Sequence, residues 1–289
     1  DFDNLITYTI NRLFPEIENN SKKYIIFFKK ICELQIDLIT EWMRVGFIHG
    51  VMNTDNMTIS GETIDYGPCA FMDIYNPETV FSSIDHHGRY AFLNQPTITK
   101  WNLARFAETL LPLIDKNKNK AIEIATELIN EFDQLFNKNW LEMMRKKLGF
   151  FGEKKEDESL IGVLLSLMHN HKADYTNTFY SLMNNETKKD KMFQSNEFIK
   201  WNANWNKRLE KNNKSHEESL KLMYLNNPLV IPRNHKVEEA LKAANNQDLK
   251  PMLKLLQVLE KPYEKQKAIN DYRSPAPASD KKYQTFCGT

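Results

Sequence analysis

Apolar side chains recur at steps of three and four residues in the segment from Tyr24 to Met43. The positions that carry this spacing are Phe27, Ile31, Leu34, Leu38, Ile39 and Trp42. Residues at such intervals share one face of an α-helix. The pattern therefore predicts a helix that faces the core and leads into a polar loop after Gly46.

Two short segments beyond this helix have a different pattern. Residues 57–60 and 63–66 alternate in part between apolar and polar side chains, and Gly61-Glu62 separates them. Two residues containing glycine between alternating segments are typical of a hairpin turn. We therefore expect a short β-hairpin here, followed by an irregular stretch up to Pro96, where glycine and proline recur.

The rest of the chain is mostly helical in its pattern. Spacing of three and four residues predicts helices over 101–114, 120–148, 158–169, 175–183, 197–225, 237–245 and 249–260. Two prolines favour an extended conformation over residues 227–234. From Tyr272 onward the chain is rich in proline, alanine, serine and lysine, and we expect this tail to be loosely held.

Composition narrows the class of protein. The 289 residues are 41% hydrophobic and 27% charged, which is ordinary for a soluble globular protein. With 39 basic and 38 acidic residues the net charge of +1 gives no overall electrostatic signature of a nucleic-acid or membrane binder. Three cysteines do not make a disulfide scaffold, so a reducing compartment is expected. The first residue is Asp1 and no signal peptide pattern follows, so we interpret the chain as a piece of a longer protein.

Candidate chemistry is concentrated in one polar loop. The run from His49 to Asn56 is followed nine residues later by Asp65. Phosphoryl-transfer sites of the kinase type use the same order, with an asparagine and a later aspartate that hold Mg²⁺ through oxygen atoms. Val51 stands where kinases carry their catalytic aspartate, and the nearest carboxylate is Asp55.

The order of these residues, more than the residue types, favours a site. A run such as Asn53-Thr54-Asp55-Asn56 forms an ordinary turn in most proteins. Here it lies between the long predicted helix and the segment ending at Asp65, which is where a metal loop is expected. His49 is expected to hold this loop by hydrogen bonds and not to act as a base.

Several motifs together resemble one family. The segment 46–68, which includes His49-Gly50-Val51-Met52-Asn53-Thr54-Asp55-Asn56, closely resembles the selenoprotein O family, also called YdiU, of kinase-like protein adenylyltransferases. The resemblance continues through residues 85–92, 94–96, 101–105, 227–228, 233–234 and a cysteine three places from the end. Several dissimilar motifs that occur in the same order are much stronger evidence for a family relationship than a single polar loop.

The resemblance implies an activity and a role for each residue. Asp55 would accept the proton of the attacking hydroxyl, Asn56 and Asp65 would hold Mg²⁺ or Mn²⁺, and Asp65 would also approach the nucleotide. AMP from ATP would pass to serine, threonine or tyrosine hydroxyls of protein substrates. Three alternatives stay open: a phosphotransferase or a UMP transferase on the same fold, and a regulatory module without catalysis. A monomer is expected, in the cytoplasm of a bacterium or in a mitochondrion of a eukaryote.

The resemblance also implies a fold. It predicts a mainly α protein: a kinase-like C-lobe over residues 1–150 with a short β-hairpin, a helical extension over 151–271, and the tail 272–289. The glycine-rich loop and the lysine–glutamate pair of the family's small lobe are not found in this sequence. Because positioning and charge neutralisation supply most of such catalysis, we expect this chain alone to be inactive.

A redox switch is the last feature that the resemblance implies. Family members are associated with a disulfide between a C-terminal cysteine and a cysteine in the activation segment, near the position of Phe81. Cys287 occupies the terminal place here, and Cys69 lies four residues after Asp65. We hypothesise a disulfide between Cys69 and Cys287. The alternative is a small unpaired thiol in the core and a second thiol in the tail.

Overall fold

The computed structural model describes residues 1–186, 190–267, 269–277 and 282–286. Most of these residues are helical, which confirms the mainly α prediction. The α-helices are α1 (Phe2–Leu13), α2 (Lys23–Val45), α3 (Gln95–Ile114), α4 (Lys118–Lys147), α5 (Asp157–Asn170), α6 (Tyr175–Asn184), α7 (Asn196–Glu210), α8 (His216–Asn226), α9 (Asn234–Asn245), α10 (Lys250–Leu259) and α11 (Ile269–Arg273). Strands β1 (Phe47–Ile48) and β2 (Ala70–Phe71) and the short 3₁₀ helices η1 (Thr54–Asn56), η2 (Phe92–Asn94) and η3 (Lys191–Gln194) complete the elements.

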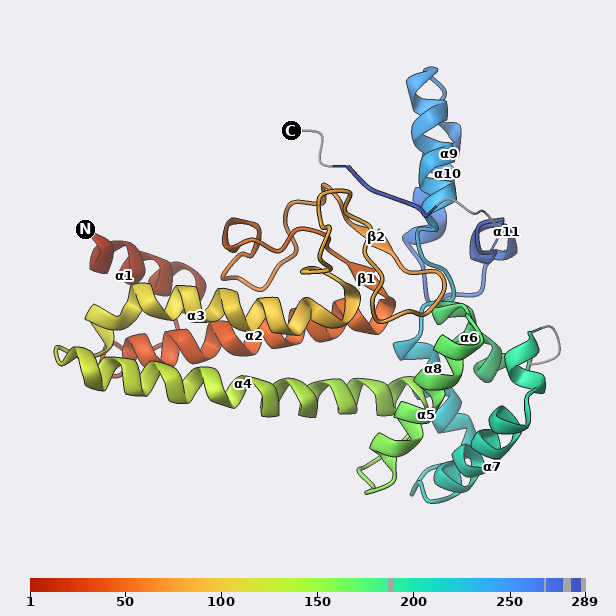
Figure 1. Ribbon diagram of the computed structural model, residues 1–289, viewed down its shortest axis with the longest axis horizontal. Helices are drawn as coiled ribbons and strands as arrows, with labels where there is room; N and C mark the ends of the chain where they lie inside the picture. The colour runs from red at the N-terminus through yellow and green to blue at the C-terminus, as the bar shows by residue number, and fades with distance from the viewer. Residues whose placement is uncertain (187–189, 268, 278–281, 287–289) are drawn as a thin grey trace.

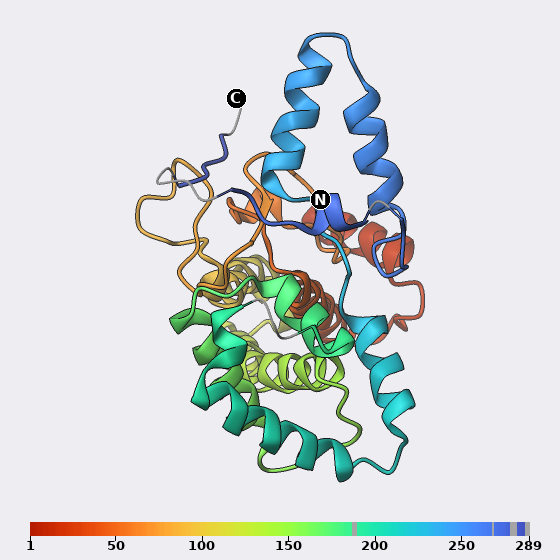
Figure 2. The ribbon, with the colours of Figure 1, turned by 90° about the vertical axis from the view of Figure 1, so that its right-hand side faces the viewer.

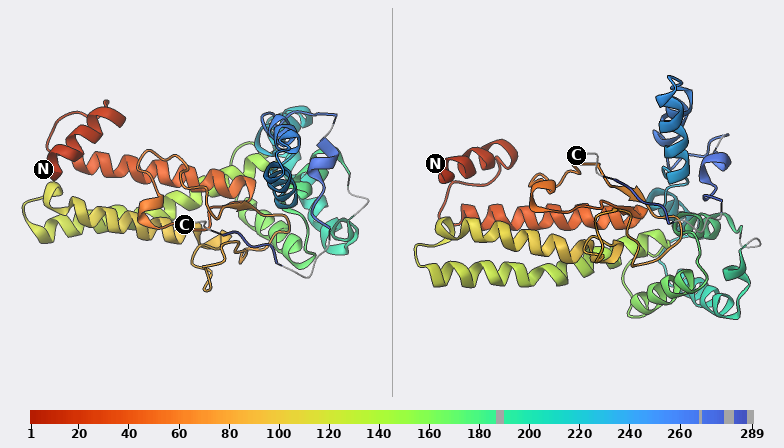
Figure 3. Two further views of the ribbon diagram at one scale, coloured as in Figure 1. Left: turned by 90° about the horizontal axis from the view of Figure 1, so that it is seen from above. Right: turned by 45° about the horizontal axis from the view of Figure 1, so that its top comes forward.

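Three long helices form the elongated half of the molecule. Helices α2, α3 and α4 lie side by side, and α1 lies near their far end (Figures 1 and 3). A cluster of buried apolar side chains joins these four helices; it includes Ile10 from α1, Phe28 from α2, Leu110 from α3 and Phe132 from α4. Helix α3 begins six residues before its predicted start, because Pro96 fits the first turn of a helix, where its missing N–H is not needed.

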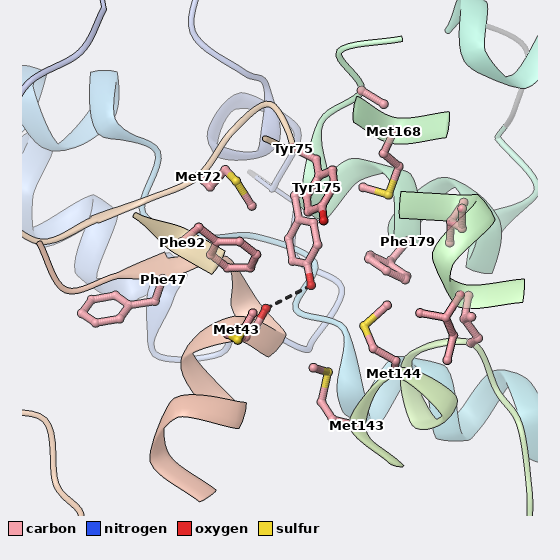
Figure 4. Packing of buried hydrophobic residues seen from close by; sticks show 14 of the residues in the cluster. Met43, Phe47, Met72, Tyr75, Phe92, Met143, Met144, Met168, Tyr175 and Phe179 are labelled. Carbon is pink, nitrogen blue, oxygen red and sulfur yellow. Dashed lines mark hydrogen bonds between the residues drawn. The ribbon is translucent and has the colours of Figure 1, made fainter. Parts of the chain in front are cut away.

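A second, larger cluster of buried residues fills the other end. It is rich in methionine and aromatic side chains from α2, α4, α5 and α6 (Figure 4). The hydroxyl of Tyr175 is buried there and donates to the carbonyl oxygen of Met43, 3.0 Å away, at the end of α2. This cluster takes residues from both sides of position 150, so one core joins the two regions that the sequence analysis separates. That boundary stays a prediction.

The single helix predicted over 197–225 is wrong, because two helices occupy this range. Helix α7 ends at Glu210 and α8 begins at His216. Ser215 and Glu218 form a capping box: the serine hydroxyl accepts from the backbone of Glu218, whose carboxylate accepts from the backbone of Ser215. This Ser-x-x-Glu signal was present in the sequence and marks a helix start.

The predicted β-hairpin is wrong in its position. Between the two predicted strands the structure has a single antiparallel bridge, from Met57 to Thr63. Side chains of α2 take up the nearby hydrogen-bonding groups: Gln35 Nε2 donates to the carbonyl oxygen of Thr58, and Trp42 Nε1 donates to Thr63 Oγ1. The regular strands are β1 and β2, which pair antiparallel on either side of this segment.

Helices α9 and α10 form an antiparallel hairpin that projects from the body (Figure 2). The C-terminal segment runs from this region toward the site, and its residue Thr285 forms a parallel bridge with Ser82. This attachment differs from the loosely held tail that composition predicts. Within the described part of the chain, no helix is both long and apolar enough to cross a membrane.

Candidate catalytic and metal-binding loop

One closed loop carries all three predicted site residues. Helix α2 ends at Gly46, whose φ of +75° is the left-handed conformation that commonly terminates helices. Strand β1 follows at once and pairs with β2, Phe47 opposite Phe71 and Ile48 opposite Ala70. Residues 49–69 are therefore joined at their base, and Asp55, Asn56 and Asp65 all lie within this stretch.

The two sides of the loop approach most closely at Gly50. This residue has a φ of +89°, and a Cβ atom there would lie 2.6 Å from the carbonyl oxygen of Pro68. Backbone atoms cannot move away as a flexible side chain can, so only glycine fits. Pro68 comes three residues after Asp65, and Gly50 five residues before Asp55. The contact thus limits how the half of the loop with Asp55 and the half with Asp65 lie relative to each other.

The half of the loop that carries Asp55 is anchored from α3 and from the segment before it. Asn102 Nδ2 donates to the carbonyl oxygen of Met52 at 3.0 Å, and the Tyr90 hydroxyl donates to Asn53 Oδ1 at 2.7 Å. Asp55 itself is exposed in η1. A carboxylate held on an anchored but open turn is accessible to a hydroxyl group of another protein.

The side chain of Asn56 is oriented within the loop. Its Nδ2 donates to the carbonyl oxygen of Val51 at 3.1 Å. Because a carbonyl oxygen only accepts, this bond fixes which end of the amide faces inward. The Oδ1 oxygen is then the end available to a ligand, which is the atom that a hard cation requires.

Two stacked aromatic rings, those of Trp42 and His49, hold the segment that leads into Asp65. His49 is fully buried, stacks on Trp42 at a ring-centroid distance of 5.2 Å, and donates from Nε2 to the carbonyl oxygen of Ile64 at 2.8 Å. The main-chain N–H of His49 donates to Gln95 Oε1 at 3.1 Å. These contacts agree with the structural role expected for His49, because its Nε2 proton is used to hold the residue before Asp65.

Asp65 is exposed and has a strained backbone. Its φ of +54° lies in the left-handed region, which residues other than glycine adopt rarely and mostly at turns and functional sites. Aspartate and asparagine tolerate this conformation better than most residues. Asp65 lies directly after a segment that Trp42 and His49 hold through hydrogen bonds to Thr63 and Ile64.

The side-chain oxygens of Asn56 and Asp65 would fit a divalent cation only if other ligands complete its coordination. Among the described residues, no group of three or more histidine, cysteine, aspartate or glutamate side chains could hold a metal ion. Asn56 and Asp65 offer hard oxygen atoms, and a cation such as Mg²⁺ takes its other ligands from phosphate groups and water. To hold a divalent cation, Asn56 and Asp65 would therefore need further ligands, such as phosphate oxygens or water.

The predicted redox residues are only partly described. Cys69 is half-buried, and its Sγ donates to the carbonyl oxygen of Tyr66 at 3.3 Å. Burial, and secondarily the charge of Asp65, raises the pKa of the Cys69 thiol. Cys287 lies outside the described residues. Its neighbour Thr285 donates from Oγ1 to the carbonyl oxygen of Pro68 at 2.6 Å and from its N–H to that of Phe81 at 2.8 Å.

Sequence reasoning missed most of the supporting residues. Gln95 and Asn102 lie within motifs that carry the family resemblance, but no role was assigned to them. Their side-chain amides satisfy main-chain groups of β1 and of the loop, since Gln95 Nε2 donates to the carbonyl oxygen of Phe47 and Asn102 Nδ2 to that of Met52. A polar residue on an otherwise apolar helix face was the available signal. Nothing in the sequence pointed to Thr285.

Comparison with known proteins places the chain in one family. Residues 1–260 match the family described as "Protein adenylyltransferase SelO". The chain is 55% identical over 289 residues to "Protein nucleotidyltransferase YdiU" of Pelagibacter ubique (strain HTCC1062), and this covers 100% of the chain and 60% of the relative. The protein of the same name from Clostridium perfringens (strain 13 / Type A) is 53% identical over 289 residues, again over all of the chain and 59% of the relative. The chain belongs to the SelO family, and it spans about 60% of the length of these curated relatives.

Proposed function

We propose that this chain is the large lobe of a protein adenylyltransferase with a kinase-like arrangement. The observation that carries the proposal is the closed loop 49–69, which presents Asp55, Asn56 and Asp65 from one anchored turn and one strained position. Membership of the SelO family supports nucleotidyl transfer as the chemistry. The activity belongs to the full-length protein, because the chain spans only part of its relatives.

Each residue has a distinct task in this proposal. A serine, threonine or tyrosine hydroxyl of a protein substrate attacks the α-phosphorus of ATP, and its proton passes to Asp55. The new bond joins the hydroxyl oxygen to the α-phosphorus, and the bond to pyrophosphate breaks. Asn56 and Asp65 would hold Mg²⁺ or Mn²⁺, which neutralises phosphate charge when it is bound. Asp55 is exposed, which suits a substrate as large as a protein.

The position of a label in ATP tests this assignment. Full-length protein is expected to transfer label to protein from α-labelled ATP and not from γ-labelled ATP, because AMP is the group that moves. A parallel reaction with α-labelled UTP measures UMP transfer. Transfer from γ-labelled ATP alone would show a phosphotransferase and overturn the proposal. The 289-residue chain is expected to transfer little, because the groups that position the phosphates are outside it.

We also propose that Cys69 and Cys287 form a disulfide under oxidising conditions. Thr285 bonds to the carbonyl oxygen of Pro68, next to Cys69, and Cys287 follows two residues later, a span of at most about 7 Å along the chain. Two thiols would give up two protons and two electrons to an oxidant such as a peroxide. The bond would fix the C-terminal segment beside Asp65.

Mass spectrometry after thiol alkylation tests the pairing. Full-length protein treated with peroxide is expected to take up two fewer alkyl groups than reduced protein, and the linked peptides should contain Cys69 and Cys287. The variant Cys69→Ser should lose this difference, whereas Cys32→Ser should keep it, because Cys32 is buried in α2. Equal masses for oxidised and reduced protein would refute the disulfide.

A further inference from the structure

Helix α10 has two apolar faces, and only one of them is buried. Leu255 and Val258 are 8% and 1% exposed and face the molecule. Four other apolar side chains, three on the same helix and one on the residue just before it, lie in solvent, and we call them the α10 stripe. They are Leu249 (49% exposed), Met252 (40%), Leu253 (56%) and Leu256 (52%).

The α10 stripe is continuous along the helix. Its residues are spaced by three, four and seven positions, and at 3.6 residues per turn they occupy a sector about 100° wide. This is the width by which a helix usually contacts a core. The polar residues Lys250, Lys254 and Gln257 lie between the stripe and the buried face, on one flank of the helix. The pattern is therefore that of a helix with a second packing partner.

The hairpin that carries the stripe is held firmly at its base. The N–H of Leu229 donates to the carbonyl oxygen of Pro262 at 2.7 Å, joining the segments before α9 and after α10. The Tyr283 hydroxyl donates to Glu238 Oε1 at 2.8 Å and so ties α9 to the C-terminal segment. Leu241 of α9 is also 54% exposed. The apolar side chains are thus presented on a fixed projection and not on a loose end.

The direction of the projection limits what can cover it. The hairpin rises on the same side of the long helices as β1, β2 and the loop 49–69 (Figures 1 and 3). Any lobe placed over Asp65 to hold nucleotide phosphates would occupy the space next to the hairpin. About 40% of the length of the curated relative from Pelagibacter ubique lies outside the matched region, which is enough chain for a further lobe.

We propose that the α10 stripe is the docking surface for the small lobe of the full-length protein, on the premise that the function proposed above requires such a lobe over the loop. Burial of the stripe would then fix the small lobe relative to Asp65 by a contact remote from the nucleotide. A large exposed apolar surface rarely persists without a partner. A lobe of the same chain is favoured over a second copy because the hairpin rises on the same side of the long helices as the loop that the lobe must cover.

Cysteine protection in the full-length protein tests the contact without using activity. The variants Leu253→Cys and Lys254→Cys place thiols on adjacent residues, one in the stripe and one outside it, and both residues are exposed in this chain. We expect a maleimide to label position 253 at least about tenfold more slowly than position 254, because labelling requires the contact to open. Labelling at equal rates would overturn the proposal, whether or not the protein transfers AMP.

Photo-crosslinking identifies what covers the stripe. Benzoylphenylalanine at position 256 of the full-length protein should crosslink within one chain, to a peptide of the small lobe that lies outside these 289 residues. The same group at position 254 serves as the control. Three outcomes would contradict docking of the small lobe. They are crosslinks between two chains, protection that disappears on dilution, and crosslinks no stronger than those of the control.

Discussion

Replacing Asp65 by asparagine in the full-length protein is expected to reduce nucleotide transfer by about a hundredfold to a thousandfold, the usual cost of removing one preorganised electrostatic group. The change removes the charge that would bind the cation. It keeps the shape of the side chain and a residue type that tolerates the left-handed backbone found here, with φ of +54°. Transfer of label from α-labelled ATP gives the measurement, and the melting temperature should stay close to that of the parent protein.

Two further variants make the result specific. Glu62→Gln removes a carboxylate from the same loop; this group accepts a hydrogen bond from Ser60 and lies outside the proposed site, so transfer should be unchanged. Asp65→Ala should lose both transfer and some stability, because alanine adopts the left-handed region less readily. If Asp65→Asn transferred AMP as fast as the parent, the metal-binding role would be wrong and the non-catalytic interpretation would gain support.

The largest expected effect on stability comes from Asp157, which is fully buried between two arginines. Its Oδ1 lies 2.6 Å from Arg208 Nε and its Oδ2 lies 2.8 Å from Arg145 Nε, with both arginine side chains at most 11% exposed. The substitution Asp157→Ala would leave the buried Arg208 without a carboxylate partner and Arg145 with only the exposed Glu153. We expect the free energy of unfolding to fall by about 3–5 kcal/mol. Chemical denaturation of the full-length protein measures this change.

An exposed pair next to Asp157 provides the control. Glu156 pairs with Lys211 at the surface. Solvent screens such pairs, so Glu156→Ala should leave the denaturation midpoint almost unchanged. A small effect for both variants would mean that the buried network relaxes or admits water when Asp157 is removed.

The pH dependence of the Asp157 effect has a definite sign. Burial by itself would raise the pKa of Asp157, but hydrogen bonds from Arg208, the Lys154 N–H and Arg145 outweigh it and lower the pKa below the usual value. The folded protein therefore keeps this carboxylate ionised at a pH where the unfolded chain binds a proton. Its contribution is complete above the unfolded pKa, near 4, and is lost as pH falls through the folded value. The stability difference between the parent and Asp157→Asn should shrink below about pH 4.

Periodicity alone located most of the helices, but local signals decided their ends. Helix α2 was predicted almost to its limits, because its apolar face is regular over 20 residues and Gly46 follows it. The break between α7 and α8 was not predicted, although the Ser-x-x-Glu spacing of Ser215 and Glu218 is typical of a helix start. No apolar residue occurs between Leu209 and Leu220, so this polar gap was a second signal of the break, although apolar residues at helical spacing lie on both sides of it.

The strands could not be found by the same means. Each has only two residues, and they pair across the 21 residues of the intervening segment 49–69. The alternation at residues 57–66 was genuine but did not lead to a ladder, because Gln35 and Trp42 of α2 bond to this segment. Side-chain partners from a distant helix thus replaced the strand partners that the local pattern suggested.

The sequence by itself determined the helical composition, the polar loop after α2, and the family, since these depend on local spacing and on motifs in a fixed order. The tertiary structure decided how the loop is closed at Gly50 and Pro68, which amides of Gln95 and Asn102 hold it, and that Thr285 binds beside it. Those contacts join residues far apart in the chain, and their geometry depends on how the helices pack. No local pattern specifies that packing, so only the folded molecule reveals it.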